Sequence, residues 1–347
     1  MSSHLEQELR QQPKALARLI EKQLGYAEQV RELFLRDDVQ YILIASRGSS
    51  SNAARYAQYL LGRAYRVPVA FATPSLFTLY EQPPRLDGAL VIGISQSGKS
   101  PDVVEVVTEA RRQGRPTIAL TNTPSSPLGQ AADGVLKLEA GKEQAVAATK
   151  TYVNSLGAVA LLFATSTADA QALGELQRLP GQLAAQLDHS WEHVTEIDRL
   201  GAAVEGGTVV SRGINYCTAF EIALKIRELS GLLFESWSAA DLMHGPVAAI
   251  GPGWPVVAVA PSGPALGAMA EAVAAVAARG ARTVVISDDA ELRAQGEIGL
   301  PLIPGVPEWL SPLVAVVPGQ LAALRLAQLR GIDLDAPLGL SKVTLTR

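Results

Sequence analysis

Two short segments rich in hydroxyl side chains each follow an apolar, strand-like run. They are Ser46-Arg-Gly-Ser-Ser-Ser51 and Ser95-Gln-Ser-Gly-Lys-Ser100, and each leads into a helix-like stretch. Small residues let backbone N–H groups approach an anion, serines donate hydrogen bonds, and a helix N-terminus adds partial positive charge. Serine is also a common helix N-cap, so one segment alone would leave both interpretations open. Two such segments favour a phosphate site, although neither matches the P-loop pattern.

A second group of side chains has the types needed for acid–base chemistry. In Glu221-Ile-Ala-Leu-Lys-Ile-Arg-Glu228, the spacing predicts a helix with Glu221, Lys225 and Glu228 on one face. By spacing alone, a solvated ladder of ion pairs is the ordinary interpretation of this face. His244 lies in the turn-forming context Asp241-Leu-Met-His-Gly-Pro246, where a lone histidine is more often structural than catalytic.

The segments that contain these residues belong to an internal repeat of the sequence. Thr208–Gly213 repeats the run that ends at Gly48, 165 residues later, and Ser262-Gly263 repeats Ser97-Gly98 at the same offset. A third element, Arg112–Leu120, parallels Ala278–Ile286 one residue out of that register. A spacing held across three elements indicates an internal duplication rather than two unrelated α/β domains.

Each copy alternates short β-branched runs with longer Ala- and Leu-rich helical stretches. The runs are apolar on both faces, as in parallel strands covered on both sides. Helices over Ser100–Gln113 and Pro264–Arg279 cross between them, and Gly114 and Gly280 stand where a helix should end. The predicted fold class is α/β: two tandem doubly wound units, each a parallel sheet with helices on both faces.

We therefore expect five segments along the chain. They are N-terminal helices over residues 1–38, a first unit over 39–166, a helical connector over 167–200, a second unit over 201–330 and a tail over 331–347. Because the tail resembles neither unit, we expect it to pack over another part of the chain; that it contributes to the active site is implied by the resemblance described below.

Composition limits the classes of function. Of 347 residues, 48% are hydrophobic and 18% charged, and the net charge of −4 comes without a long basic run. We therefore expect ordered cores and no nucleic-acid partner. Cys217 is the only cysteine, which fits a reducing cytoplasm and leaves no cysteine pairs for zinc. Leu156–Ala164 is about half the roughly 20 residues that a membrane helix needs, so we expect no membrane segment. We also expect neither a metal nor an organic cofactor.

Five motifs, in order, resemble the tandem SIS (sugar isomerase) family, and in particular the isomerase half of glutamine–fructose-6-phosphate amidotransferases. The resemblance runs from about residue 40 to the C-terminus. The motifs are Ser95-Gln-Ser-Gly98, Ala147-Ala-Thr-Lys150, the helix Glu221–Glu228, His244-Gly-Pro246, and the tail Asp333-Leu-Asp-Ala-Pro337 with Ser341-Lys-Val-Thr344.

The resemblance implies a role for each matching residue. Glu228 would move the proton between C1 and C2 of a sugar phosphate, and Lys225 would support that charge network. His244 would assist ring opening from the partner subunit of a homodimer, and Lys342 would meet the open-chain carbonyl. The phosphate- and sugar-binding positions would be Ser49, Ser50, Ser95, Gln96, Ser97, Ser100, Val146 and Ala148.

Some positions depart from the amidotransferase pattern. Arg47, Lys99 and Ala148 stand where that family has a cysteine, an acidic residue and a serine. Ser2 occupies the position of the glutaminase cysteine nucleophile, so we expect no glutamine hydrolysis. The first hypothesis is a glucosamine-6-phosphate deaminase, as in the type II deaminases with a similar first serine loop. The alternatives are another sugar-phosphate isomerase or fructosamine-phosphate deglycase, and a non-catalytic sugar-phosphate-binding regulator.

Overall fold

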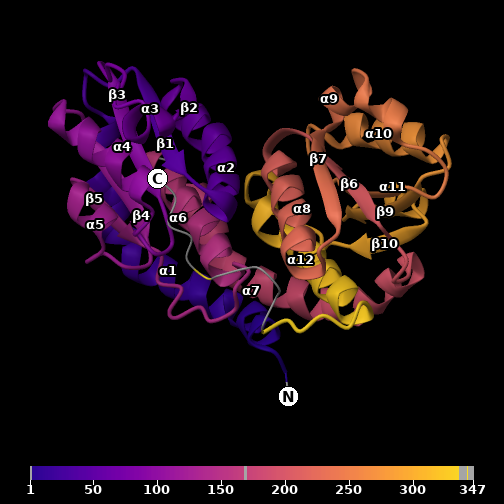
Figure 1. Ribbon diagram of the computed structural model, residues 1–347. Helices are drawn as coiled ribbons and strands as arrows, with labels where there is room; N and C mark the ends of the chain where they lie inside the picture. Colours follow the sequence, from indigo (N-terminus) through magenta and orange to yellow (C-terminus); the bar gives the residue numbers. More distant parts are fainter. Residues whose placement is uncertain (1, 168–169, 336–341, 343–347) are drawn as a thin grey trace. The chain divides into compact units, whose positions relative to one another are not determined.

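The structure is a computed structural model that describes residues 2–167, 170–335 and Lys342 (Figure 1). The chain divides into two compact units. Among the described residues, the N-terminal unit comprises residues 11–143, 148–167, 170–180 and Lys342, and the C-terminal unit comprises residues 2–10, 144–147 and 181–335.

The N-terminal unit is built on a parallel sheet with the strand order β2-β1-β3-β4-β5. The inner strands β3 and β4 are buried at every position, as expected of strands covered on both faces. The strands are β1 Tyr41–Ser46, β2 Val69–Phe71, β3 Ala89–Ile94, β4 Thr117–Thr121 and β5 Gly134–Lys137.

Helices cover both faces of this sheet. One face packs on α3, α4 and α5 through an apolar cluster that includes Phe77, Val103 and Leu128, and α2 and α6 pack against each other elsewhere in the unit. Gly114 ends the helix before β4 with a φ of +72°, as the sequence predicts. The helices are α1 His4–Phe34, α2 Gly48–Tyr65, α3 Ser75–Thr78, α4 Pro101–Arg112, α5 Pro127–Ala131 and α6 Lys150–Ser166.

The C-terminal unit repeats the same topology, because its sheet has the order β10-β9-β8-β6-β7 and all its strands are parallel. Counted from the first strand of each unit, both sheets have the order 2-1-3-4-5, which confirms the predicted tandem α/β architecture. The strands are β6 Gly206–Ser211, β7 Leu233–Ser238, β8 Pro255–Val259, β9 Arg282–Ser287 and β10 Ile298–Pro301.

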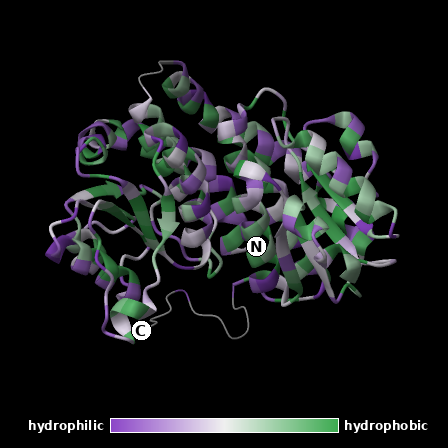
Figure 2. Cartoon of the chain, turned by 90° about the horizontal axis from the view of Figure 1, so that it is seen from above, coloured by the Kyte–Doolittle hydropathy of each residue, from purple (hydrophilic) through white to green (hydrophobic). Residues whose placement is uncertain are grey.

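The helices of this unit include a closely packed pair, α8 and α12. At their contact, a Cβ on Gly319 would lie 2.3 Å from Ile222, so only glycine fits there. The helix α7 Ala170–His193 belongs to this unit from Gly181 onward. The other helical segments are η1 Val194–Leu200, η2 Gly213–Asn215, α8 Tyr216–Ser230, α9 Ala239–Met243, η3 Pro246–Ala249, α10 Leu266–Ala277, α11 Ala290–Ala294, η4 Glu308–Leu310 and α12 Ser311–Leu329. Figure 2 shows apolar strands, in green, beneath helices whose outer faces carry polar residues.

One apolar helix is longer than the sequence analysis expected. Among the described residues, Glu308–Leu329 is long and apolar enough to cross a membrane by length and composition, and 94% of its apolar window is buried inside the protein. The expectation of no membrane-length segment rested on shorter apolar runs such as Leu156–Ala164 and did not include this helix. Its burial and its packing on α8 are those of a core helix.

Candidate active site

The two serine-rich segments of the N-terminal unit leave the same edge of its sheet. Strands β1 and β3 are parallel neighbours, and Ser46 is paired in register with Ile94. Within the first segment, the hydroxyls of Ser46 and Ser51 lie 3.1 Å apart, and within the second those of Ser95 and Ser100 lie 3.3 Å apart. Both segments therefore leave the carboxyl edge of the sheet, which is where parallel sheets bind ligands.

The first segment is more helical than predicted, since α2 begins at Gly48 and its first turn contains Ser49, Ser50 and Ser51. The N-cap positions are Arg47 for α2 and Ser100 for α4, and neither makes a side-chain capping hydrogen bond. Ordinary N-capping therefore does not explain these residues. Two helix N-termini beside grouped hydroxyls form an arrangement suited to an anion.

The loop over Ser95–Ser100 is held by its own hydroxyls. Ser95 Oγ accepts from the N–H of Gly98 at 3.2 Å, and Ser97 Oγ accepts from the N–H of Lys99 at 3.3 Å. Gly98 has a φ of +63°, and a Cβ there would lie 1.9 Å from Ser126 Oγ. Only glycine allows this tight turn, which brings Gln96 and Ser97 to partly exposed positions.

An ion pair joins the two segments. Arg47 Nε donates to Asp102 Oδ2 at 2.5 Å, and the Asp102 side chain is 2% exposed while that of Arg47 is 52% exposed. Asp102 belongs to the first turn of α4, directly after the second segment. The pair therefore links the start of α2 to the start of α4 and helps to fix the spacing of the two hydroxyl groups.

A buried carboxylate that the sequence analysis missed holds Lys342. Glu143 accepts from the N–H groups of Thr149 and Thr151 at 3.0 and 3.1 Å, and from Thr151 Oγ1 at 2.7 Å. Lys342 Nζ donates to Glu143 Oε2 at 2.7 Å, the same oxygen that accepts from Thr151 Oγ1. Burial alone would raise the pKa of Glu143, but the charge and hydrogen bond of Lys342 together with the Thr151 hydrogen bonds lower it below its usual value.

Of the predicted tail, residues 336–341 and 343–347 lie outside the described residues, so only Lys342 and residues 331–335 can be placed. The contact with Glu143 puts the Lys342 ammonium beside the N-terminus of α6. A weak signal for Glu143 existed in the sequence, because an acidic residue a few positions before a helix can serve its N-terminal N–H groups.

The charged face of α8 in the C-terminal unit is buried. Lys225 Nζ lies 3.5 Å from Glu221 Oε1 and also donates to Glu228 Oε2. The side chains of Glu221 and Lys225 are 0% and 1% exposed, whereas that of Glu228 is 26% exposed. The solvated ion-pair ladder that spacing alone suggested is therefore wrong. Glu228 is the member of the group that a ligand can reach.

The remaining predicted residues are placed as follows. His244 ends α9 and is exposed, and Lys99 is exposed as well. Val146 and Ala148 are half-buried in the segment before α6. The structure thus groups the serines of the N-terminal unit, joins Lys342 to Glu143, and groups Glu221, Lys225 and Glu228.

Comparison with known proteins matches this architecture. The family model described as SIS domain matches residues 35–165 and 208–330. The glutamine–fructose-6-phosphate aminotransferase (isomerizing) of Pyrococcus horikoshii is 36% identical over 341 residues, which cover 96% of this chain and 56% of that protein. The chain thus spans about half the length of the curated relatives it matches.

Solved structures give the same result. The C-terminal domain of glucosamine-fructose-6-phosphate aminotransferase from Francisella tularensis superposes with a TM-score of 0.85 at 26% identity, covering 96% of this chain and 98% of that one. Glucosamine-6-phosphate deaminase from Thermotoga maritima superposes with a TM-score of 0.78 at 21% identity, covering 99% and 100%. The second likeness is one of fold alone.

Proposed function

Because this chain belongs to the SIS domain family, we propose that it is a phosphosugar isomerase that converts glucosamine 6-phosphate and water to fructose 6-phosphate and ammonia. The observation that carries the proposal is the charge group on α8. A buried lysine lies between two carboxylates, and only Glu228 is open to a ligand. A single reachable carboxylate is what proton transfer between adjacent carbons requires.

Each group of residues has its own role in the proposed reaction. The substrate phosphate binds the hydroxyls of Ser50, Ser95, Ser97 and Ser100, the side chain of Gln96 and the N-termini of α2 and α4. Ser49, Val146 and Ala148 lie beside the sugar. The grouping of these hydroxyls at one sheet edge supports this assignment.

Chemistry begins with ring opening, which His244 assists as an acid–base group. Glu228 then takes the proton from C2 and returns it to C1, so that the amine at C2 becomes an imine. Water adds to the imine carbon and ammonia leaves, which yields the ketose phosphate. Lys225 holds Glu228 in place, and Glu143 holds the Lys342 ammonium for contact with the open-chain oxygen.

The first test measures ammonia and fructose 6-phosphate together from glucosamine 6-phosphate. The two products should appear in equal amounts, and Glu228→Gln should lower kcat by about 10²- to 10⁴-fold, the usual contribution of a general base. Glu271→Gln, which changes an exposed carboxylate on α10, is the matched control and should retain activity. If neither product appears while sugar phosphates still bind, the deaminase proposal fails and a panel of ketose and fructosamine phosphates follows.

A second test addresses the phosphate site. Ser97→Ala should raise KM about 10- to 100-fold, because a hydrogen bond to a charged group contributes about 1.5–3 kcal/mol. The internal repeat offers a control, since Ser262 is the exposed counterpart of Ser97 in the C-terminal unit. Ser262→Ala should leave KM unchanged, and an equal effect of both changes would place the phosphate elsewhere.

A further inference from the structure

A cluster of imidazole and carboxylate groups lies at the end of α7, and none of its members has been given a role above. Among the residues that the structure describes, His189, Glu192 and His193 present one ligand atom each within 4.8 Å of one another. Their spacing, His-x-x-Glu-His, puts all three on one side of the last helical turn. The expectation of no metal rested on the lack of cysteine pairs or another evident ligand cluster in the sequence, and it overlooked this spacing.

The two imidazoles lie against each other. Their ring centroids are 4.6 Å apart with an interplanar angle of 67°. Glu192 Oε2 lies 3.6 Å from His189 Nδ1, so the carboxylate already faces one of the rings. Two histidines at i and i+4 on one helix face are a known pair of nitrogen ligands for zinc, and a nearby carboxylate oxygen is an acceptable third ligand.

One imidazole has a fixed tautomer. The Nδ1 atom of His193 lies 2.9 Å from the carbonyl oxygen of His189, which can only accept a hydrogen bond. Nδ1 therefore carries the proton, and Nε2 keeps the lone pair that a metal needs. Metal-binding histidines commonly donate their other N–H to a carbonyl in this way.

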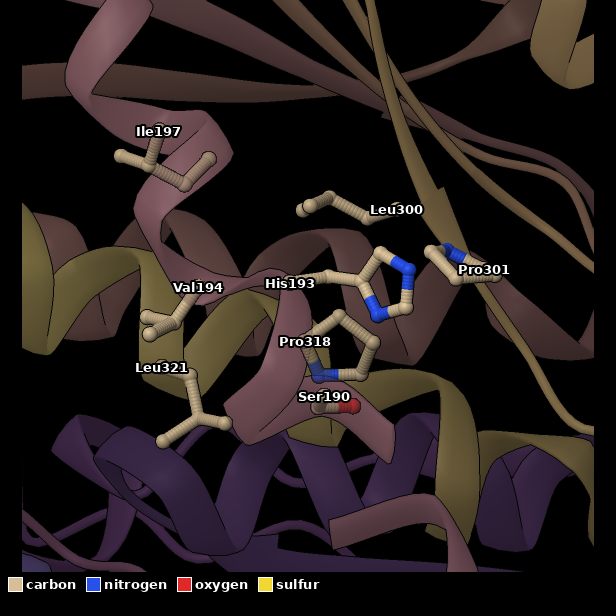
Figure 3. A pocket seen from close by; sticks show the side chains of 8 residues that line it. All are labelled: Ser190, His193, Val194, Ile197, Leu300, Pro301, Pro318 and Leu321. Carbon is tan, nitrogen blue, oxygen red and sulfur yellow. The ribbon is translucent and has the colours of Figure 1, made fainter. Parts of the chain in front are cut away.

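Packing also limits the movement of the His193 ring. Its side chain points into a small pocket and lies near Leu300, Pro301 and Pro318 (Figure 3). The side chains of His189 and Glu192 are 34% and 72% exposed, so an ion can reach the cluster from solvent. Because packing already holds the His193 ring, only the exposed side chains of His189 and Glu192 would lose conformational entropy when a metal binds.

We propose that His189, Glu192 and His193 form a binding site for a borderline divalent transition metal, with Zn²⁺ as the probe of choice. Ligand atoms around tetrahedral zinc lie roughly 3.4 Å apart, given bonds of about 2.0–2.2 Å. The spread of 4.8 Å closes to that value by rotation of the exposed Glu192 and His189 side chains. All three ligands belong to the last turn of α7, so a bound ion would brace that turn.

The test is a calorimetric titration of the whole chain, without an affinity tag, with ZnCl₂ in a non-coordinating buffer. Wild-type protein should bind one equivalent at this site and its melting temperature should rise with Zn²⁺. Loss of an outer-shell partner already lowers metal affinity about 10- to 100-fold, so His189→Ala and Glu192→Gln should each weaken binding about 10-fold or more. Both residues are partly or largely exposed, so neither change should prevent folding.

The matched control is His4→Ala, because His4 is a histidine on a different helix, α1. It should bind Zn²⁺ as tightly as wild type, and it excludes a general effect of losing one imidazole. Unchanged affinity in both His189→Ala and Glu192→Gln would show that the ion binds elsewhere and would overturn the proposal. Absence of binding by the wild-type chain would overturn it as well. The proposed sugar chemistry does not depend on either result.

Discussion

Glu143 and Glu228 lie in different surroundings, one buried and one partly exposed, and this difference suits them to different roles. Glu143 is fully buried, accepts hydrogen bonds from the N–H and hydroxyl groups of Thr149 and Thr151, and is paired with Lys342. Glu228 keeps a quarter of its side chain exposed beside a buried lysine. The first arrangement suits a residue that holds structure together, and the second suits one that exchanges protons with a ligand.

Replacing Glu143 with Gln should lower stability by about 3–5 kcal/mol at pH 7, because it leaves Lys342 and the α6 N–H groups without their anion. The folded-state pKa of Glu143 lies below its ordinary value. Its contribution is therefore present above the unfolded pKa and is lost as the pH falls through the folded one. Urea unfolding between pH 7 and pH 3 should accordingly show a smaller loss of stability for the variant than for wild type.

Glu105→Gln supplies the control for that experiment, since Glu105 is an exposed carboxylate on α4 of the same unit. It should unfold with the wild-type pH dependence. If Glu143→Gln kept the wild-type slope, the acid-sensitive group would be a different one.

Prediction from sequence succeeded where the signal is local. The position of Ser97 and Gly98 directly after a strand was predicted because a serine-rich loop that follows an apolar run is visible in a few residues, whereas their role in binding stays a prediction. Glu143 was missed because one of its partners, Lys342, is 199 residues away. The common face of Glu221, Lys225 and Glu228 followed from helical spacing, but its burial depends on the packing of the unit and could not be read from the helix alone.

At the scale of elements, two helices contain the same Pro-Gly step in different surroundings. In α12, Gly319 follows Pro318 and faces Ile222 of α8. In α7, Gly181 follows Pro180 and has nothing within 4 Å of where a Cβ would stand. Substituting Gly319 and Gly181 in turn therefore separates the effect of helix packing on stability from the effect of helix propensity.

Gly319→Ala should destabilise the protein by about 1–3 kcal/mol, because the added methyl group must displace Ile222 or part the two helices. Gly181→Ala should instead stabilise it by about 0.5–1 kcal/mol, because alanine favours a helix interior over glycine. Thermal unfolding of both variants measures the difference. Equal effects in the two helices would mean that α8 and α12 are less tightly packed than the structure has them.

The inner strands of both sheets were predicted closely because each is a short run of apolar, β-branched residues with a clear end. The edge strands β2, β5, β7 and β10 were not singled out. The helix α12 was not predicted as one element, since Pro318 and Gly319 interrupt its sequence in the manner of a turn. Packing in the core stabilises α12 although Pro318 and Gly319 both have low helix propensity, so here tertiary contacts override local propensity.

At the scale of the whole molecule, the repeat made the architecture predictable, because both units have the strand order 2-1-3-4-5. The sequence contains no comparable pattern that would predict whether the chain forms an oligomer. The exposed position of His244 at the end of α9 leaves it open to another chain, which supports the proposal of a homodimer with shared sites.

Subunit mixing tests that proposal. If each site combines Glu228 of one subunit with His244 of the other, neither His244→Ala nor Glu228→Ala dimers should have appreciable activity. In an equal mixture, half the dimers are mixed and each has one intact site, so about a quarter of wild-type activity should return. Verified mixed dimers without activity would show that each site is built within one chain.

The order in which the chain is synthesised affects how long the apolar helix α12 stays exposed before it is buried. The chain is made from its N-terminus at about 5–20 residues per second. The packing partner α8 ends roughly 80 residues before α12 begins, so it leaves the ribosome about 4–16 s earlier. A segment that could pass for a membrane anchor therefore emerges beside a surface ready to bury it. A circular permutant beginning just before Glu308 would reverse that order and present the segment first, to the membrane-targeting machinery.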